Sequence, residues 1–320
     1  LIQNKISPIK DSLVSSYLKK KKLNIEVSNV IDSRLSSCKF IIISTPTNFD
    51  ASKKSFDTSS INKIIEKVDK LKIKASIVIK STIPIGYVSK LNNKYKNLNI
   101  YFSPEFLREG HSLHDNLYPS RIIIGDKDKN SMMFAKTMKQ CAKGKNIKTI
   151  FMKSIEAESV KLFANSYLAT RISFFNELDN FSISNKLNSK ILIDGVCSDP
   201  RISHGYNNPS FGFGGYCLPK DSSQLKHSFK NIPNPLIASI GNSNYSRKKI
   251  ITEDILSLKT KRIGVYRIIM KKNSDNFRES SIIDIIKMLK RKNKEIYIYE
   301  PLIKNKNSLM GCKIINDLLE

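Results

Sequence analysis

A glycine-rich segment that ends in a cysteine, a lysine and an aspartate carries the strongest chemical signal in the sequence. It reads Asn207-Asn208-Pro209-Ser210-Phe211-Gly212-Phe213-Gly214-Gly215-Tyr216-Cys217-Leu218-Pro219-Lys220-Asp221. A cysteine that opens a helix lies near the positive end of the backbone dipoles, and with nearby Lys220 this favours the thiolate. Asp221, one turn later, could act as a base toward water. The segment therefore predicts a nucleophilic Cys217, and the alternative is a small cysteine buried in a turn.

Lys161 and Asn165 form a second candidate site. They are four residues apart in an apolar helical stretch and therefore share a helix face. A lysine there is desolvated unless a polar cavity receives it. An ammonium and an amide on one face could hold a developing oxyanion. The alternative is a lysine that reaches solvent and an asparagine that caps a neighbouring element.

A third candidate lies in Phe102-Ser103-Pro104-Glu105-Phe106-Leu107-Arg108-Glu109-Gly110, directly after an apolar run. Open α/β sheets place ligands beyond such strand ends. Glu105 could be an acid/base and Glu109 a cofactor or structural contact. A helix N-terminus with favourable carboxylates would explain both equally well. Thr82 and the turn Thr45-Pro46-Thr47 also follow strands, but alone they are weak signals.

Alternating apolar runs and amphipathic stretches must position these residues. Strands are predicted at 39–44, 75–79, 99–102, 121–124 and 148–152, and helices at 58–71, 85–95 and 130–143. The alternation predicts a mostly parallel sheet with helices on both faces. A second α/β pattern has strands at 262–266 and 295–299 and a helix near 279–291, with very little of a second sheet expected before Glu320. We expect a helix to begin near Cys217.

Residues 155–180 are apolar around nearly the whole helix axis. Such a helix is expected to be buried, so we interpret it as a central spine between two domains. The predicted fold class is α/β, with two Rossmann-like parallel-sheet domains, both incomplete here, joined by this long central helix.

Composition limits the classes of function. The net charge is +27, but only ten of the 55 basic residues are arginine and the lysines are scattered, so solvated helix ends are favoured over a nucleic-acid surface. No apolar run reaches the ~18 residues of a membrane helix. The five cysteines are widely spaced, without a C-x-x-C pair, which argues against disulfides or a zinc site and for a reducing compartment. We expect a cytoplasmic protein without a metal site.

Taken together, the segments resemble the UDP-glucose 6-dehydrogenase family, within the UDP-glucose/GDP-mannose dehydrogenase group. The matching stretches are 44–48, 80–86, 103–110, 116–121, 156–165, 175–179, 206–225 and 274–279. Phe-Gly-Gly-Tyr-Cys-Leu-Pro-Lys-Asp is highly specific, and Tyr216 resembles the UDP-glucose branch. The resemblance implies oxidation of UDP-glucose to UDP-glucuronate with two NAD+, through a thiohemiacetal and a thioester on Cys217. It also implies a homodimer.

The resemblance also implies roles for individual residues. Lys161 would stabilise the oxyanions with help from Asn165, Asp221 would activate or position water, and Glu105 would be the acid/base partner with Thr82 in its water network. Cofactor-side positions are Thr45, Thr82, Glu109, Lys220 and Arg278. Substrate-side positions are Glu105, Phe106, Leu107, Lys161, Asn165, Arg201, Tyr206, Asn208, Ser210, Phe213, Gly214 and Lys271.

Two departures from the family pattern bear on activity. The family begins with a βαβ unit that carries a G-x-G-Y-V-G fingerprint, and no counterpart of this unit occurs here; the first residue is Leu1, not Met. The family also continues past the point that matches Glu320. We therefore expect a partial gene product or a shortened homologue, with an NAD-binding domain at 1–153, a central helical dimerisation and catalytic domain at 154–240, and a partial UDP-sugar-binding domain at 241–320.

Alternatives to the active enzyme remain open. One is a truncated, inactive homologue that folds or dimerises without catalysis. Another is a related sugar-nucleotide dehydrogenase of the GDP-mannose type. A basic binding protein on an α/β scaffold would require the lysines to cluster on one face.

Overall fold

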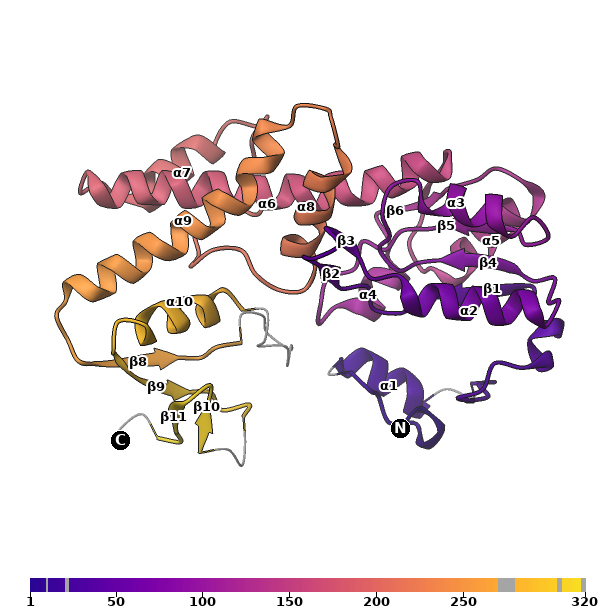
Figure 1. Cartoon of the computed structure of the whole chain (residues 1–320), viewed down its shortest axis with the longest axis horizontal. Coiled ribbons are helices and arrows are strands. Elements are labelled where there is room, and N and C mark those ends of the chain that lie inside the picture. Colours follow the sequence, from indigo (N-terminus) through magenta and orange to yellow (C-terminus); the bar gives the residue numbers. More distant parts are fainter. Residues whose placement is uncertain (10, 21–22, 270–279, 304–306, 318–320) are drawn as a thin grey trace. The chain divides into compact units, whose positions relative to one another are not determined.

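The computed structural model describes all residues of the chain except 10, 21–22, 270–279, 304–306 and 318–320 (Figure 1). The chain divides into two compact units, Leu1–Phe163 and Ala164–Glu320. The boundary falls inside α6 (Ser154–Ser184), the longest helix that the described part of the chain contains. Among the described residues, no helix has the length and apolar composition needed to cross a membrane.

The first unit is built on parallel strands. A three-stranded parallel sheet has the order β1-β4-β5, β6 pairs in parallel with β7, and β2 forms an antiparallel pair with β3. Its elements are η1 (Ile2–Asn4), α1 (Ser12–Lys20), η2 (Ser33–Ser37), β1 (Phe40–Ile43), β2 (Phe49–Asp50), β3 (Ser55–Phe56), α2 (Ser59–Lys70), β4 (Ser76–Ile79), α3 (Tyr87–Lys94), β5 (Ile100–Phe102), α4 (Ser112–Leu117), β6 (Arg121–Ile124), α5 (Lys129–Cys141), β7 (Lys148–Phe151) and the start of α6.

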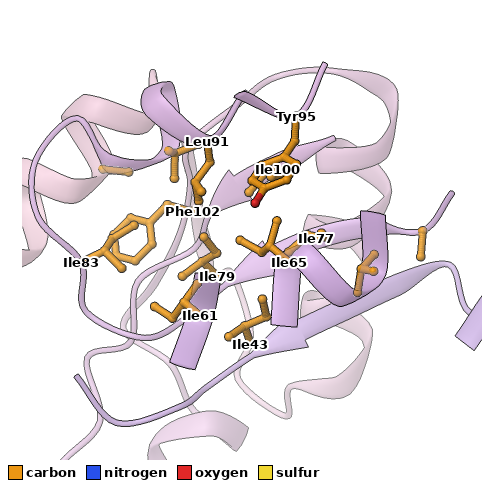
Figure 2. Packing of buried hydrophobic residues seen from close by; sticks show 14 of the residues in the cluster. Ile43, Ile61, Ile65, Ile77, Ile79, Ile83, Leu91, Tyr95, Ile100 and Phe102 are labelled. Carbon is orange, nitrogen blue, oxygen red and sulfur yellow. The ribbon is translucent and has the colours of Figure 1, made fainter. Parts of the chain in front are cut away.

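The core of this unit packs helices α2 and α3 against the sheet. Figure 2 shows Ile61 and Ile65 of α2 next to Ile77 and Ile79 of β4, and all four are fully buried. β4 is buried on both faces, as is usual for a strand within a parallel sheet. β1 is different: among the described strands it pairs only with β4, and Ile42 on it is 51 % exposed. β1 is therefore an edge strand with an apolar residue open to solvent.

The second unit combines helices with a four-stranded mixed sheet of order β10-β11-β9-β8. Its elements are the remainder of α6, α7 (Ser189–Cys197), α8 (Cys217–Ser228), α9 (Pro235–Ser257), β8 (Arg262–Tyr266), α10 (Ser281–Lys290), β9 (Glu295–Tyr299), β10 (Ser308–Leu309) and β11 (Cys312–Ile315). α10 packs on both α9 and β9, and Ile285, Ile286 and Leu289 of α10 join Ile296 and Ile298 of β9 in one apolar cluster (Figure 1).

The predicted strands and helices of both α/β patterns are present, and none of their ends is shifted by more than two residues. The expectation that very little of a second sheet precedes Glu320 is wrong, because β10 and β11 complete a four-stranded sheet. Helices α1, α4, α7 and α9 were not predicted.

The expectation that α6 is buried all round is wrong for one side of the helix. Tyr167, Phe174 and Phe181 are 64 %, 57 % and 61 % exposed, whereas Leu162, Ala169 and Phe175 are buried. The exposed residues recur every seven positions and therefore lie along one helix face. α6 thus carries an apolar stripe that its own chain leaves open to solvent.

A buried carboxyl on α6 holds the start of α3. Glu158 has no exposed surface, and its carboxyl oxygens accept hydrogen bonds from the backbone N–H groups of Gly86 and Val88. Burial raises the pKa of Glu158 to about 7, and the bonds from these N–H groups offset part of that rise. The acid is therefore protonated in the native state at a pH where it is ionised in the unfolded chain.

The raised pKa of Glu158 predicts a pH-dependent stability. Between pH 4.5 and about 7 the native state binds more protons than the unfolded state, so the free energy of unfolding falls as the pH rises through this window. The full effect is about 3 kcal/mol. Urea unfolding should show that E158Q loses this pH dependence, whereas E253Q, at an exposed glutamate of α9, retains it. Equal slopes for wild type and E158Q would contradict the assignment.

Candidate functional site

Glu105 lies in the loop that follows β5, where two lysines contact it. The Glu105 carboxylate forms an ion pair with Lys80, with Nζ 2.5 Å from Oε1. The Lys161 ammonium donates a hydrogen bond to the Glu105 backbone carbonyl. The first helix after this loop, α4, begins only at Ser112, so the interpretation of Glu105 and Glu109 as helix N-terminal carboxylates is wrong.

Lys161 is buried among polar and aromatic groups of the first unit. Only 7 % of it is exposed, so the reading of a lysine that reaches solvent is wrong. Its ammonium lies 5.3 Å from the centroid of the Phe106 ring, and the Arg121 guanidinium lies 3.8 Å from the same ring. The loop also lines a pocket of about 240 Å³, whose walls include Lys80, Glu105, Phe106, Leu107, Arg108, Asp115 and Arg121. A cationic, partly closed pocket of this kind suits an anionic ligand or a developing oxyanion.

The threonines that follow β1 and β4 are tied together. Thr47 donates its hydroxyl to the Thr82 carbonyl at 2.7 Å, and Ser81 donates to the Thr45 carbonyl at 2.6 Å. Thr45 also accepts a hydrogen bond from Ser60 at 3.0 Å. These turns and the Glu105 loop leave the carboxyl ends of three neighbouring parallel strands, which is where open α/β sheets bind their ligands. Glu109 lies in the Glu105 loop, ahead of α4.

Cys217 is the first residue of α8, and its thiol is exposed. The alternative of a small cysteine buried in a turn is therefore wrong. The preceding glycine Gly215 has φ of 79°, in the left-handed region that favours glycine, and it turns the chain into the helix. An exposed thiol on the first turn of a helix has the accessibility that a nucleophile needs.

Behind Cys217, α8 buries a polar cluster with α6. Asp221 has no exposed surface; its Oδ2 accepts a hydrogen bond from Asn165 Nδ2 at 2.5 Å, and its Oδ1 pairs with Lys220 Nζ at 3.0 Å. Asn165 therefore does not cap a neighbouring element but contacts a carboxylate 56 residues later in the chain. Lys220 also lies 4.9 Å over the Tyr216 ring. The second unit thus places a carboxylate, an amide and an ammonium one turn from an exposed thiol.

The loop before Cys217 is anchored by side chains from α6 and α9. Asn176 of α6 accepts a hydrogen bond from the Ser210 N–H, and Arg247 of α9 donates to the Ser210 carbonyl, both at 2.8 Å. The Arg247 guanidinium also pairs with Asp179 at 2.5 Å and donates to Asn180. Arg247 is 4 % exposed. One buried guanidinium therefore joins the loop to α6.

Further along, the same loop is held by α9 and α10. Asn244 donates to the Phe213 carbonyl at 2.9 Å, and Ser281 donates to the Gly212 carbonyl at 2.7 Å. Gly212 has φ of 110°, and a Cβ there would lie 2.7 Å from Asn244 Oδ1. The Phe213 ring is buried against Ala169 and Ile240. Gly212 is therefore required both by its backbone angle and by the close approach of α9.

The remaining predicted residues have different surroundings. Tyr206 and Asn208 are exposed, Gly214 is half-buried, and Arg201 is exposed and paired with Asp199 at 2.6 Å. Lys271 and Arg278 lie outside the described residues. The predicted residues thus form two groups: Glu105, Phe106 and Lys161 in the first unit, and Asn165, Ser210, Cys217, Lys220 and Asp221 in the second. Lys80, Asn176, Asp179, Asn244 and Arg247 were not predicted as site residues, because their roles depend on contacts distant in sequence.

Comparison with family models accounts for nearly the whole chain. The UDP-glucose/GDP-mannose dehydrogenase family, NAD binding domain, matches residues 1–142; the central domain of the same family matches 155–246; and its UDP binding domain matches 264–320. The predicted resemblance to this family is confirmed.

Individual relatives agree with the family models. A UDP-glucose 6-dehydrogenase of Campylobacter jejuni is 48 % identical over 318 residues, which are 99 % of this chain and 81 % of that protein. One from Streptococcus pneumoniae is 46 % identical over 325 residues, covering 100 % of this chain and 82 % of that protein. The solved UDP-glucose dehydrogenase of Pyrobaculum islandicum superposes with a TM-score of 0.85 at 21 % identity over 99 % of this chain and 77 % of that one, which shows a shared fold.

The predicted α/β fold with Rossmann-like parallel sheets and a long central helix is confirmed by that superposition. The family match extends through the NAD-binding, central and UDP-binding domains in order along the sequence. The chain belongs to the UDP-glucose/GDP-mannose dehydrogenase family and is an NAD-dependent dehydrogenase.

Proposed function

We propose that this protein oxidises UDP-glucose to UDP-glucuronate with two NAD+, through a covalent intermediate on Cys217. The observation that carries the proposal is the exposed Cys217 at the start of α8, one turn from the buried Asn165–Asp221–Lys220 cluster. An alcohol reaches the acid level only if the intermediate aldehyde is captured and oxidised again, and a thiol is well suited to that capture. The identity of 48 % to a UDP-glucose 6-dehydrogenase supports this substrate over GDP-mannose.

The carboxyl edge of the first sheet fits a dinucleotide. Three parallel strands end there in turns that supply the Thr45, Thr47 and Thr82 side chains and the Glu105–Glu109 loop. Thr45, Thr82 and Glu109 would hold the cofactor from this unit, and Lys220 and Arg278 would contribute from elsewhere in the sequence. NAD+, when bound, would accept one hydride from C6 of the sugar, and a second NAD+ bound later would accept the other.

The first half of the reaction uses Glu105 and Cys217. Glu105 accepts the C6 hydroxyl proton as the first hydride leaves C6, with Thr82 holding the water network, and the sugar is left as an aldehyde. The Cys217 thiolate then adds to C6, so that a C–S bond forms and the aldehyde oxygen becomes an alkoxide. Lys161 and Asn165 stabilise this oxyanion, because an ammonium and an amide on one face of α6 both donate hydrogen bonds.

The second half releases the acid. Loss of the second hydride from C6 converts the thiohemiacetal into a thioester. Asp221 activates water, which adds to the thioester carbonyl, and Lys161 and Asn165 stabilise the second oxyanion. The C–S bond then breaks, the Cys217 thiolate is regenerated and the carboxylate leaves.

Measured stoichiometry tests the proposal. With a limiting amount of UDP-glucose and excess NAD+, the protein should form two NADH for each sugar, followed by absorbance, with UDP-glucuronate as the product by mass spectrometry. GDP-mannose should give a kcat/KM at least about a hundredfold lower than UDP-glucose, since the protein must distinguish a uracil base from a guanine base. One NADH per sugar, no oxidation, or a preference for GDP-mannose would each rule the proposal out.

The loop between Arg201 and Cys217 is proposed to grip the UDP-sugar. Tyr206, Asn208, Ser210, Phe213 and Gly214 belong to it, and Arg201, Phe106, Leu107 and Lys271 complete the proposed substrate contacts. Its middle is supported by Arg247 and Asn244 of α9, so these residues hold the loop in a binding conformation before the substrate arrives.

Replacing Arg247 with lysine should weaken this support. Lysine keeps the charge near Asp179 but cannot reach Ser210, Asn180 and Asp179 with one planar fork. The KM for UDP-glucose is expected to rise about tenfold with a smaller change in kcat. R262K, at an exposed arginine of β8, is the matched control, and steady-state kinetics for both variants with varied UDP-glucose make the comparison. An unchanged KM in R247K would show that the loop does not depend on this anchor.

We further propose that the protein is a homodimer and that α6 forms part of the interface. Tyr167, Phe174 and Phe181 present a regular apolar stripe on that helix. A two-fold axis can pair such a stripe with its own copy, and two-fold dimers are the commonest oligomers. A second copy of the chain would thus bury the exposed aromatic rings.

Two charges on the stripe should separate the subunits. The F174K/F181K variant loses the burial of two aromatic rings, each of which contributes about 2–3 kcal/mol. The dimer dissociation constant should rise at least about a hundredfold. Sedimentation measures the dimer dissociation constant. Y118K, which alters an exposed tyrosine of the first unit, is the control. A wild-type monomer, or a variant that remains a dimer at micromolar concentration, would refute the interface.

The five cysteines are all free thiols, which suits a reducing compartment, and we propose that the reaction takes place in the cytoplasm. We also propose that residues 1–153, 154–240 and 241–320 serve as the NAD-binding, central and UDP-sugar-binding parts.

A further inference from the structure

Lys80 is a largely buried lysine that has no role in the proposed reaction. It directly follows β4, and its backbone N–H donates to the Ile43 carbonyl at the end of β1, at 2.8 Å. Its side chain is 11 % exposed, and burial lowers the pKa of Lys80 to about 8. A desolvated ammonium at the carboxyl end of a strand requires a compensating partner.

Glu105 is that partner, and hydrogen bonds to the sheet also anchor the start of the loop that carries Glu105. The Ser103 N–H donates to the Ile79 carbonyl at 2.9 Å, and the Ser103 hydroxyl donates to the Ile123 carbonyl at 3.0 Å. The loop therefore leaves β5 with its first residue bonded to strands on both sides. The Lys80 ammonium lies 2.5 Å from Glu105 Oε1, so the ion pair joins the ends of two adjacent parallel strands.

Other charged groups near Glu105 have contacts of their own. Arg108 forms hydrogen bonds with Asp115, which hold the pKa of that carboxyl at about 2. Arg121 lies over the Phe106 ring, and Lys161 donates to the Glu105 backbone carbonyl. His114 is 3.4 Å from Asp115. Lys80 contacts the Glu105 carboxylate directly.

We propose that Lys80 is a positioning residue that fixes the Glu105 carboxylate in place and keeps it ionised, and therefore ready to accept the proton of the sugar hydroxyl. The inference rests on the proposed acid/base role of Glu105. A neighbouring cation favours the charged form of a carboxyl group, and a carboxylate pinned at one oxygen leaves its other oxygen to face the substrate. Lys80 acts through Glu105 and does not itself touch the sugar.

The test compares K80Q, K80R and the matched control K148Q, which changes an exposed lysine at the start of β7. In K80Q the acidic limb of the pH profile of kcat/KM should move upward by about one pH unit or more. The KM for UDP-glucose at high pH should stay within about twofold. K80R should leave the acidic limb of the profile at the same pH as in the wild type, because arginine remains charged. In an E105Q background, K80Q should cause little further loss.

A direct titration keeps the inference separate from the proposed function. Carboxyl carbons of ¹³C-labelled glutamate, with the Glu105 signal assigned by its absence in E105Q, report the Glu105 pKa without turnover. A rise of about one unit or more in K80Q, reversed in K80R, would support the inference even if the protein does not oxidise UDP-glucose. An unchanged Glu105 signal, or an activity loss in K80Q that is uniform across pH, would overturn it. If K80Q does not fold, the K80Q/E105Q double variant, which removes both charges, shows whether an unpaired Glu105 is the cause.

Discussion

Replacing Cys217 with serine should lower the rate of UDP-glucuronate formation by at least about a thousandfold. Serine preserves the size of the side chain at the first position of α8, but its hydroxyl is a far weaker nucleophile than a thiolate. The aldehyde is then no longer captured, so the second oxidation fails while the first can still proceed slowly. Quenched-flow analysis should therefore find at most one NADH per sugar in a single turnover.

The matched control is Cys141, a second exposed cysteine, at the end of α5. C141S should retain wild-type kcat and the ratio of two NADH per sugar. A C217S variant that still forms two NADH per sugar at more than about a tenth of the wild-type rate would exclude the thiol as the nucleophile.

Replacing Lys161 with alanine should lower kcat by about a hundred- to a thousandfold, with a smaller effect on the KM for UDP-glucose. The lysine is 7 % exposed, and a donor in such a site stabilises a developing negative charge more strongly than one in water. The effect belongs to the transition state, because both the thiohemiacetal and the hydrolysis step develop an oxyanion.

Steady-state kinetics and the thermal unfolding midpoint are measured together, since Lys161 also holds the Glu105 carbonyl. K153A, one residue before α6, is the control at an exposed lysine, and its kcat should be unchanged. A K161A variant that raises KM without lowering kcat would show that Lys161 binds the ground state and does not stabilise the oxyanions.

Much of the fold follows from local sequence patterns. The isoleucine run 122–124 predicts a buried parallel strand because β-branched apolar residues suit both faces of a covered sheet, and all three residues are buried. In α2, Ile61, Ile65 and Val68 recur at helical spacing and all are buried. Helix α9 was missed, because its polar residues Asn244 and Arg247 face inward and break the expected apolar period. Such residues resemble surface positions until their partners are known.

The candidate site could be predicted residue by residue but not as a set of contacts. The spacing of Lys161 and Asn165 places both on one helix face, and both are buried. The bond between Asn165 and Asp221 joins residues 56 positions apart, and no periodicity indicates it. The ion pair of Lys80 and Glu105 is equally hidden, because a lysine after a strand is usually a solvated loop residue. Burial, which only the fold determines, separates these residues from the other scattered lysines.

The most direct test of the account is the mass of the peptide that contains Cys217 after acid quench during turnover. In D221N, where the residue proposed to activate water is neutral, hydrolysis should become the slow step and the thioester should accumulate. Mass spectrometry should then find a UDP-glucuronyl group on Cys217, dependent on both UDP-glucose and NAD+, and absent from C217S. Slow turnover of D221N with an unmodified Cys217, or the adduct on a different residue, would contradict the central claim that this cysteine carries the sugar between its two oxidations.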